Sequence, residues 1–257
     1  MKRNKSAIVI MGLICVMFGF NSSSSVYNQN ETYIQPGISV VKAANNDNVE
    51  KDNIEKDSST SVNTMSNIEE KIALNKIIIK KEKEQIESVT YDKEDMTKLS
   101  GVTEQQMEKV LNEHGAGETM AHLSKAFVDS EKEHGVNAFI MAGIVALESG
   151  FATSRRAVED NNLTGYEVYS DDSQGKIFSS QYNSVVQTAR HLSDNYLEEG
   201  AVYYLGKSID SVQLHYCPDE EYDKKWEIHV DNLANQFLEV YKNIYIKTNT
   251  EYETAMK

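Results

Sequence analysis

The segment from Ile144 to Ser154, IVALESGFATS, places a single carboxylate, Glu148, at the end of an apolar helical run. Asn137 suits the N-cap of that helix, and Gly150 suits a left-handed stop two residues after the glutamate. A negative charge at this end faces the negative end of the helix dipole in poorly solvated surroundings. Both effects predict a raised pKa for the Glu148 carboxyl, the property that a general acid needs. The alternative is a partly exposed glutamate at an ordinary helix end.

The other residues that could do chemistry form weaker patterns. The six histidines show no His-Glu-x-x-His spacing and the cysteines form no ligand pairs, so we expect no metal and no other cofactor. Cys217 follows His215 by two residues, a spacing that would place both side chains on one face of a strand. A small, inert core cysteine is the favoured interpretation, because free cysteine is among the most buried residue types.

The charge of the chain limits its partners. The 257 residues have a formal net charge of -14. Such a chain should not be drawn to nucleic acid or to anionic membrane surfaces by long-range attraction. Acidity that keeps a secreted protein soluble is the favoured interpretation, and we expect a monomer.

The N-terminus has the layout of a secretory signal. Basic residues within 2–5 precede a short apolar core from Ala7 to Phe20, which is short for a membrane span. We assign residues 1–44 to this signal, with cleavage either at the VKAA segment 41–44 or within the serine run 22–25. An uncleaved membrane anchor is the alternative. In either case contact with the membrane would be made through this segment alone.

Four regions follow the signal. Residues 45–67 are almost free of large apolar side chains and are expected to be a disordered linker. Residues 68–95 are charged and are expected to form a solvated helical stalk, because only one seam of the heptad pattern is apolar. Residues 96–246 form the predicted folded domain, and residues 247–257 form a C-terminal tail.

The folded domain is expected to be mainly helical. One amphipathic helix begins at Thr103, has Met107, Val110 and Leu111 on its inward face, and stops at Gly115. Helical periodicity recurs before and after the helix that ends at Glu148. Directly after that glutamate, two short apolar runs flank a polar turn and predict a small β-hairpin over 163–182.

Two ordered motifs resemble the bacterial glucosaminidase family of cell-wall hydrolases. The first is Ala-Leu-Glu-Ser-Gly-aromatic at the end of a helix, followed by Asn-Asn-Leu and a glycine. The second is a tyrosine followed by an aspartate and another tyrosine. The matching residues are Ala146 to Phe151, Asn161, Asn162, Leu163 and Gly165 for the first motif, and Tyr216, Asp219, Tyr222 and Trp226 for the second. The resemblance covers about residues 97–245, the whole predicted domain.

The resemblance implies a lysozyme-like, α-rich fold that cleaves the β-1,4 bond after N-acetylglucosamine in peptidoglycan. The chain would then be an exported or cell-wall protein whose partner is the glycan strand. Three residues depart from the family pattern: Thr164 replaces an aromatic residue, Tyr166 an aliphatic one and Ala152 a glycine. Thr164 and Tyr166 are expected on the groove wall, so they bear on subsite preference more than on the reaction.

Glycoside hydrolysis needs an acid for the leaving oxygen and a group that stabilises or traps the cationic sugar. Glu148 suits the first role. For the second role Glu167 ranks first, and Asp171 and Asp172 are the alternatives. The 2-acetamido group of the substrate could also attack, and Tyr216 would then orient that group.

The same resemblance gives a set of candidate substrate-binding residues. They are Phe151, Asn162, Tyr166, Tyr169, Asp171, Tyr222 and Trp226. A muramidase and a lytic transglycosylase on the same fold are alternative activities, although the Gly-Leu-Met-Gln segment that usually follows Glu-Ser in transglycosylases is missing here. A wall-binding module that holds glycan without cleaving it is the alternative of another class.

Overall fold

The computed structural model describes residues 58–169, 173–217 and 226–247. Its contacts divide these residues into two units, with the boundary between Ile78 and Ile79. Helix α1, Ser58–Ser88, crosses that boundary. The segment 58–67, which we expected to be disordered, is therefore helical. The rest of the predicted linker, the secretory signal and the C-terminal tail from residue 248 lie outside the described residues.

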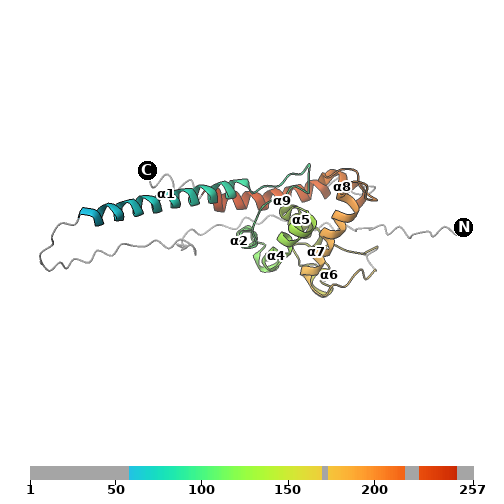
Figure 1. The fold of residues 1–257 in the computed structure, drawn as a ribbon. Helices are drawn as coiled ribbons and strands as arrows, with labels where there is room; N and C mark the ends of the chain where they lie inside the picture. The colour runs from blue at the N-terminus through green and yellow to red at the C-terminus, as the bar shows by residue number, and fades with distance from the viewer. Residues whose placement is uncertain (1–57, 170–172, 218–225, 248–257) are drawn as a thin grey trace. The chain divides into compact units, whose positions relative to one another are not determined.

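The unit that begins at Ile79 is a helical domain built around helix α5. Its described elements are α2 (Glu104–His114), α3 (Gly117–Met120), a 3-10 turn (Ala121–Leu123), α4 (Ser124–His134), α5 (Ala138–Ser149), α6 (Arg155–Glu159), α7 (Gln181–Leu192), a π-helical turn (Ser193–Leu197), α8 (Ile209–Tyr216), α9 (Trp226–Lys242) and a final π-helical turn (Asn243–Lys247). Helix α5 packs mainly against α9 and also against α4 and α7, while α2 packs against α9 and α4 (Figure 1). The prediction of a mainly helical domain is confirmed.

Helix α5 is the core element because nearly all of its side chains are buried. Asn137 caps its start, where the Asn137 Oδ1 atom accepts hydrogen bonds from the backbone N–H groups of Phe139 and Ile140. Gly143 lets α9 come close: a Cβ atom at this position would lie 3.0 Å from the carbonyl oxygen of Val230. The absence of a side chain at Gly143 therefore fixes how closely α5 and α9 approach each other.

Helix α2 has the boundaries that the sequence predicts. The Thr103 hydroxyl accepts from the backbone of Gln106, and the Gln106 side chain accepts from the backbone of Thr103, which completes a capping box. Gly115 ends the helix with φ of 91°, and Met107 lies in the core with its predicted neighbours.

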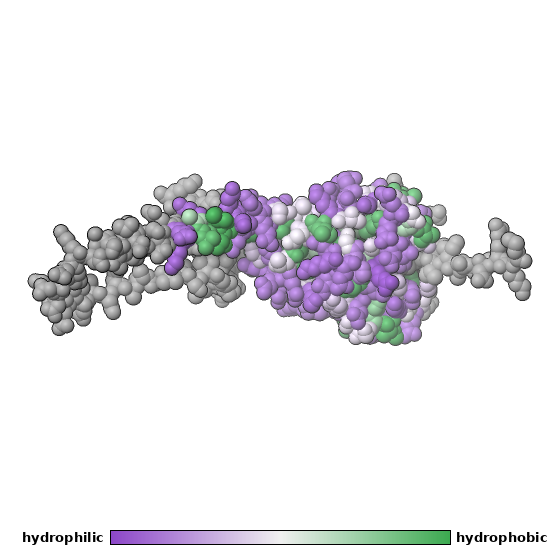
Figure 2. Space-filling model, viewed as in Figure 1, coloured by the Kyte–Doolittle hydropathy of each residue, from purple (hydrophilic) through white to green (hydrophobic). Residues whose placement is uncertain are grey.

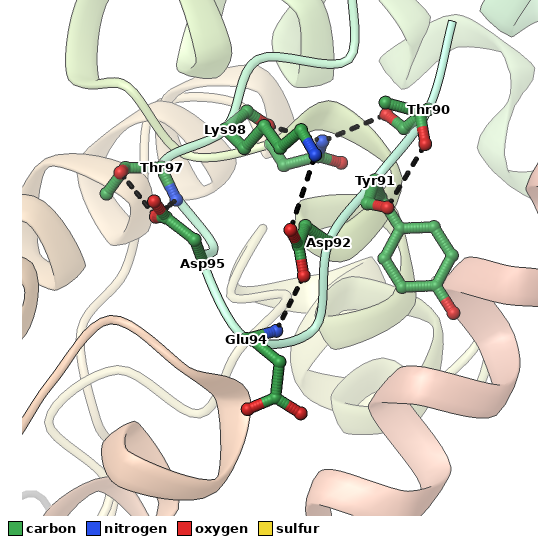
Figure 3. Close-up of polar contacts among 8 residues, drawn as sticks. Thr90, Tyr91, Asp92, Glu94, Asp95, Thr97 and Lys98 are labelled. Carbon is green, nitrogen blue, oxygen red and sulfur yellow. Dashed lines mark hydrogen bonds and ion pairs between the residues drawn. The ribbon is translucent and has the colours of Figure 1, made fainter.

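The segment that joins α1 to α2 belongs to the folded domain rather than to the stalk. Val89 is buried, seven residues before the predicted start of the domain at Met96. Figure 3 shows how polar contacts shape this segment: the Asp92 carboxylate accepts from the backbone of Glu94 and pairs with Lys98 at 3.3 Å. Asn137 Nδ2 also donates to the carbonyl of Lys98, at 2.8 Å, and so ties the segment to the start of α5.

The predicted β-hairpin after the acid is wrong for the described residues, which contain no strand. One backbone hydrogen bond, from Lys176 N to Tyr166 O, crosses the segment at 3.0 Å. The side-chain amide of Asn162 donates to the same Tyr166 carbonyl and to the carbonyl of Lys176, and so takes the place of further backbone hydrogen bonds between the two arms. Glu167 also has φ of 58°, which is not a strand conformation.

Hydrophilic residues dominate the face of the molecule shown in Figure 2, and the hydrophobic residues on it form separate small areas. Among the exposed apolar side chains are Leu74, Ile77, Ile78 and Ile79 on α1. Within the part of the chain that the structure describes, no helix is both long enough and apolar enough to cross a bilayer.

Candidate active site

The chain leaves α5 through a left-handed turn that begins two residues after Glu148. Gly150, Phe151 and Ala152 follow one another with φ of 59°, 58° and 61°. Side chains disfavour this conformation by about 1 kcal/mol or more per residue. Ser149 offsets the cost, because its hydroxyl donates to Val145 O at 2.5 Å and accepts from Ala152 N at 2.7 Å. Ser149 therefore fixes the direction of the chain beside the acid.

Glu148 is half-buried, and its Oε1 atom accepts a hydrogen bond of 2.7 Å from the indole Nε1 of Trp226. Trp226 is the first residue of α9 and is only 2 % exposed. The two residues are separated by 78 positions, and the close packing of α5 on α9 brings them together. The indole was predicted to bind substrate, and its contact here is with the acid. This donor restricts the orientation of the Glu148 carboxyl group.

A row of aromatic rings continues from this pair. The ring of Trp226 lies 5.1 Å from that of Tyr216, which lies 5.8 Å from that of Tyr196. The row continues through His191 at 5.7 Å and ends at Tyr166, a further 5.4 Å away. We call these five residues the aromatic row. It connects the acid to the loop that follows α6.

Tyr216 lies inside this row and is 0 % exposed. Its ring packs edge-on against Tyr196 and tilted against Trp226. A side chain in this position supports the indole of Trp226, and contact with a sugar would require it to be uncovered.

The aromatic row is uncharged near neutral pH. Burial lowers the pKa of His191, so its neutral form is favoured. The Nδ1 atom of His191 lies 3.1 Å from the Nδ2 atom of Asn195. When Asn195 Nδ2 donates to Nδ1, the proton of the neutral ring is on Nε2. Burial also raises the pKa of Tyr196 and of Tyr166.

Asn162 organises the loop between Asp160 and Phe178. Its side chain is 1 % exposed, and its Oδ1 atom accepts from Tyr166 N at 2.8 Å. Its Nδ2 atom donates to the carbonyls of Tyr166 and Lys176, both at 3.0 Å. These three contacts hold the loop in place, and a substrate-binding role for Asn162 stays a prediction.

Three of the predicted site residues lie on this loop and differ in their exposure to solvent. Glu167 and Tyr169 are exposed, and Tyr166 is half-buried with the ammonium of Lys176 at 5.0 Å from its ring centroid. Thr164 does not lie on a groove wall, as we expected. It is fully buried, and its hydroxyl bonds to that of Thr188 on α7 at 2.7 Å.

Phe151 lies on the other side of the left-handed turn. Its ring stacks on that of His114 at 6.0 Å, and His114 in turn contacts the ring of Phe237 at 4.7 Å. This placement joins the turn to α2 and α9. The remaining predicted residues, Asp171, Asp172 and Tyr222, lie outside the described residues.

Sequence analysis did not find two members of the aromatic row, His191 and Tyr196. They lie five positions apart at the junction of α7 with the π-helical turn, which brings their rings together. An ordinary helical pattern does not pair residues at that spacing. Among the described residues no group of three or more potential ligands could hold a metal ion.

Comparison of the sequence with known proteins finds distant relatives of this chain. Two relatives, from Streptococcus pneumoniae serotype 4 (strain ATCC BAA-334 / TIGR4) and from Streptococcus pneumoniae (strain ATCC BAA-255 / R6), are named provisionally as endo-β-N-acetylglucosaminidases. Each is 22% identical over 134 residues, which is 51% of this chain. The match spans only 20% of the first relative and 19% of the second.

A family model described as "Glucosaminidase: Mannosyl-glycoprotein endo-beta-N-acetylglucosaminidase" matches residues 124–256, more than half of the chain. The matched region includes α5 with Glu148, the Asn162 loop and Trp226. The chain belongs to the glucosaminidase family of glycoside hydrolases.

Proposed function

We propose that this chain is an exported peptidoglycan hydrolase that cleaves the β-1,4 bond after N-acetylglucosamine, with Glu148 as the general acid. The observation that supports the assignment is the hydrogen bond from Trp226 Nε1 to Glu148 Oε1, at 2.7 Å. It fixes a half-buried carboxyl group at the C-terminal end of a buried helix. A carboxyl group so placed can protonate a glycosidic oxygen.

In the proposed reaction Glu148 gives its proton to the oxygen that leaves, and the bond between that oxygen and the anomeric carbon breaks. The positive charge that develops on the sugar ring is stabilised or trapped by a second group. Water then adds to the anomeric carbon, and the Glu148 carboxylate takes up the proton that the water releases.

The second group is either the carboxylate of Glu167 or the acetamido oxygen of the substrate. Glu167 is exposed and stands in a left-handed conformation that favours glycine, and Asn162 holds the loop beside it. Backbone strain at a charged, exposed residue is common at functional sites. A Glu167→Gln variant should lose most of its activity if this carboxylate takes part, and should keep it if the acetamido group acts alone.

The aromatic row connects the residues to which we assign roles in the reaction. Trp226 orients the acid and Tyr216 supports Trp226, while Tyr166 at the other end belongs to the loop with Glu167. The row thus connects the residue that orients Glu148 with the loop that contains Glu167. Tyr169, exposed on the same loop, is available to pack on a sugar ring.

Export is proposed from the sequence of residues 1–44, and a glycan in the cell wall is the substrate that export would make available. N-terminal sequencing of the protein recovered from culture medium and from cell walls tests this part. A start within 22–45 in either fraction supports cleavage, and an intact N-terminus in the membrane fraction supports the anchor.

The test of the activity is digestion of purified peptidoglycan by the full chain, followed by reduction and mass analysis of the soluble products. N-acetylglucosamine at the new reducing ends is the expected result. N-acetylmuramic acid there would identify a muramidase, and anhydro ends a transglycosylase. A folded protein that releases no product would contradict the proposed hydrolysis.

A further inference from the structure

A cavity lies between the end of α4, the loop after Gly175 and helix α7. Its volume is about 460 Å³, which is within the usual range for sites that bind small ligands. Its lining includes two apolar side chains, Phe178 and Val186. It also includes three charged side chains, with Glu133 on α4, Lys176 on the loop and Arg190 on α7.

Two of the lining side chains are basic. The Lys176 ammonium lies 5.0 Å from the ring centroids of both Tyr166 and Phe178, which holds it in place by cation–π attraction. Arg190 is exposed, and its Nε atom pairs with Asp194 at 3.4 Å. In a chain of net charge -14, two cations that line one cavity can attract an anion locally.

One lining side chain is acidic. Glu133 is exposed in the last turn of α4, next to His134, and this end of the helix carries the negative end of the dipole. The lining therefore has charges of both signs together with Phe178 and Val186, and we call it bipolar.

Tyr166 links this cavity to the proposed active site. Gln187 and Lys176, which both line the cavity, contact Tyr166 by a side-chain hydrogen bond and by the cation–π contact. The ring of Tyr166 also meets His191 and so belongs to the aromatic row that leads to Glu148. A ligand in the cavity would contact the same loop that we assign to the glycan site.

We propose that the cavity binds a short peptide that carries both carboxylate and amine groups, such as the stem peptides attached to the glycan of peptidoglycan. The choice of this peptide class rests on the proposed function, whereas the bipolar character of the cavity does not. Lys176 and Arg190 bind the carboxylates, Glu133 binds the amine, and Phe178 and Val186 contact the alkyl parts of the side chains.

The probe is the synthetic peptide L-Ala-γ-D-Glu-L-Lys-D-Ala-D-Ala, titrated into the full-length protein and followed by NMR. We expect saturable binding with shifts in α7, and at least about fivefold weaker binding for Arg190→Gln. Arg155→Gln is the matched control, because the Arg155 side chain is as exposed as that of Arg190. Each arginine also pairs with an acidic residue four positions later in the chain, and Arg155 pairs with Glu159 at 3.1 Å. Its affinity should change less than about twofold.

Two results would overturn the proposal: no saturable binding to the wild-type protein, or equal weakening by Arg190→Gln and Arg155→Gln. Because the peptide has no glycosidic bond, its binding is independent of hydrolysis and should persist in Glu148→Gln. Peptide binding without cleavage of peptidoglycan would refute the proposed function and keep this site. Cleavage without peptide binding would refute only the site.

Discussion

Helix α5 has a glutamate near each of its ends, and the two glutamates have opposite surroundings. Glu131 of α4 lies at the start of α5, is 6 % exposed and accepts hydrogen bonds from the backbone N–H groups of Ser100, Gly101 and Ala138 at 2.8 to 3.1 Å. Glu148 lies at the other end, is half-buried and accepts from an indole at 2.7 Å.

The comparison shows how the same side chain can serve structure or chemistry. At the start of α5 the helix dipole and the N–H groups both stabilise a carboxylate, so Glu131 joins the segment 89–102, α4 and α5. At the end of α5 the dipole opposes the charge, and the partner is a side chain that fixes orientation. The two ends of α5 therefore differ in their hydrogen bonding: Glu131 has three backbone donors, and Glu148, which we propose as the acid, has a side-chain donor.

The largest expected effect is on activity at the C-terminal end of α5. Glu148→Gln keeps an oxygen that can accept from Trp226, so the free energy of unfolding should change by less than about 1 kcal/mol. It removes the proton that the leaving oxygen needs, so the rate on peptidoglycan should fall about 10²- to 10⁴-fold. Turbidity clearance of cell walls and urea unfolding measure the two quantities, and an active variant would remove Glu148 from the mechanism.

At the other end of the helix, Glu131→Gln should have the reverse effect. The amide has one acceptor oxygen and adds donors that face backbone N–H groups, so we expect a loss of about 3 kcal/mol in the free energy of unfolding. The rate per folded molecule should stay within about twofold of the wild type. If Glu131→Gln and Glu148→Gln changed stability equally, the distinction between the two carboxylates would be wrong.

Trp226→Phe sharpens the comparison, because it removes the donor to Glu148 and keeps most of the ring that packs on Tyr216. We expect about a tenfold loss of rate from a less well oriented acid. The indole N–H favours the ionised carboxyl group, so its removal should move the basic limb of the pH–rate profile to higher pH, which loss of packing alone would not cause. Stability measured in parallel should fall by about 1 to 2 kcal/mol. An unchanged pH profile would show that the indole does not act on the acid.

The smallest effect concerns the pH dependence of stability. His191 titrates with a pKa below that of an unfolded chain, because burial disfavours its cation. Below about pH 6.5, the ordinary value for histidine, the unfolded state therefore binds more protons, and this contribution to stability falls as the pH drops toward the folded-state pKa. Urea unfolding at pH 7.5 and pH 5 should show a smaller pH effect in His191→Phe than in the wild type. An equal dependence would exclude His191 as its source.

Much of the fold follows from local patterns in the sequence. The caps Thr103, Gly115, Asn137 and Gly150 are confirmed, because each depends on residues within one turn of the helix. The burial of α5 likewise follows from the sequence, because apolar residues occupy every face of this helix.

The parts that sequence analysis missed depend on residues far apart in the chain. Nothing near Trp226 indicates that it donates to Glu148, 78 positions earlier, and nothing near Glu131 indicates its three backbone donors. The hairpin prediction failed because the pattern of alternating apolar residues does not show that the Asn162 amide takes the carbonyls of the loop. Thr164 was misplaced because its hydroxyl has a buried partner on α7.

The most direct test of Glu148 as the acid varies the leaving group. Wild type and Glu148→Gln are compared in the first turnover of two substrates that share the same N-acetylglucosamine-ended oligosaccharide. One substrate has a sugar leaving group and the other a dinitrophenyl group, which departs without a proton. The loss of rate should be about 10²-fold or more for the sugar and less than about tenfold for the dinitrophenyl substrate. An equal loss for both substrates would contradict proton donation by Glu148.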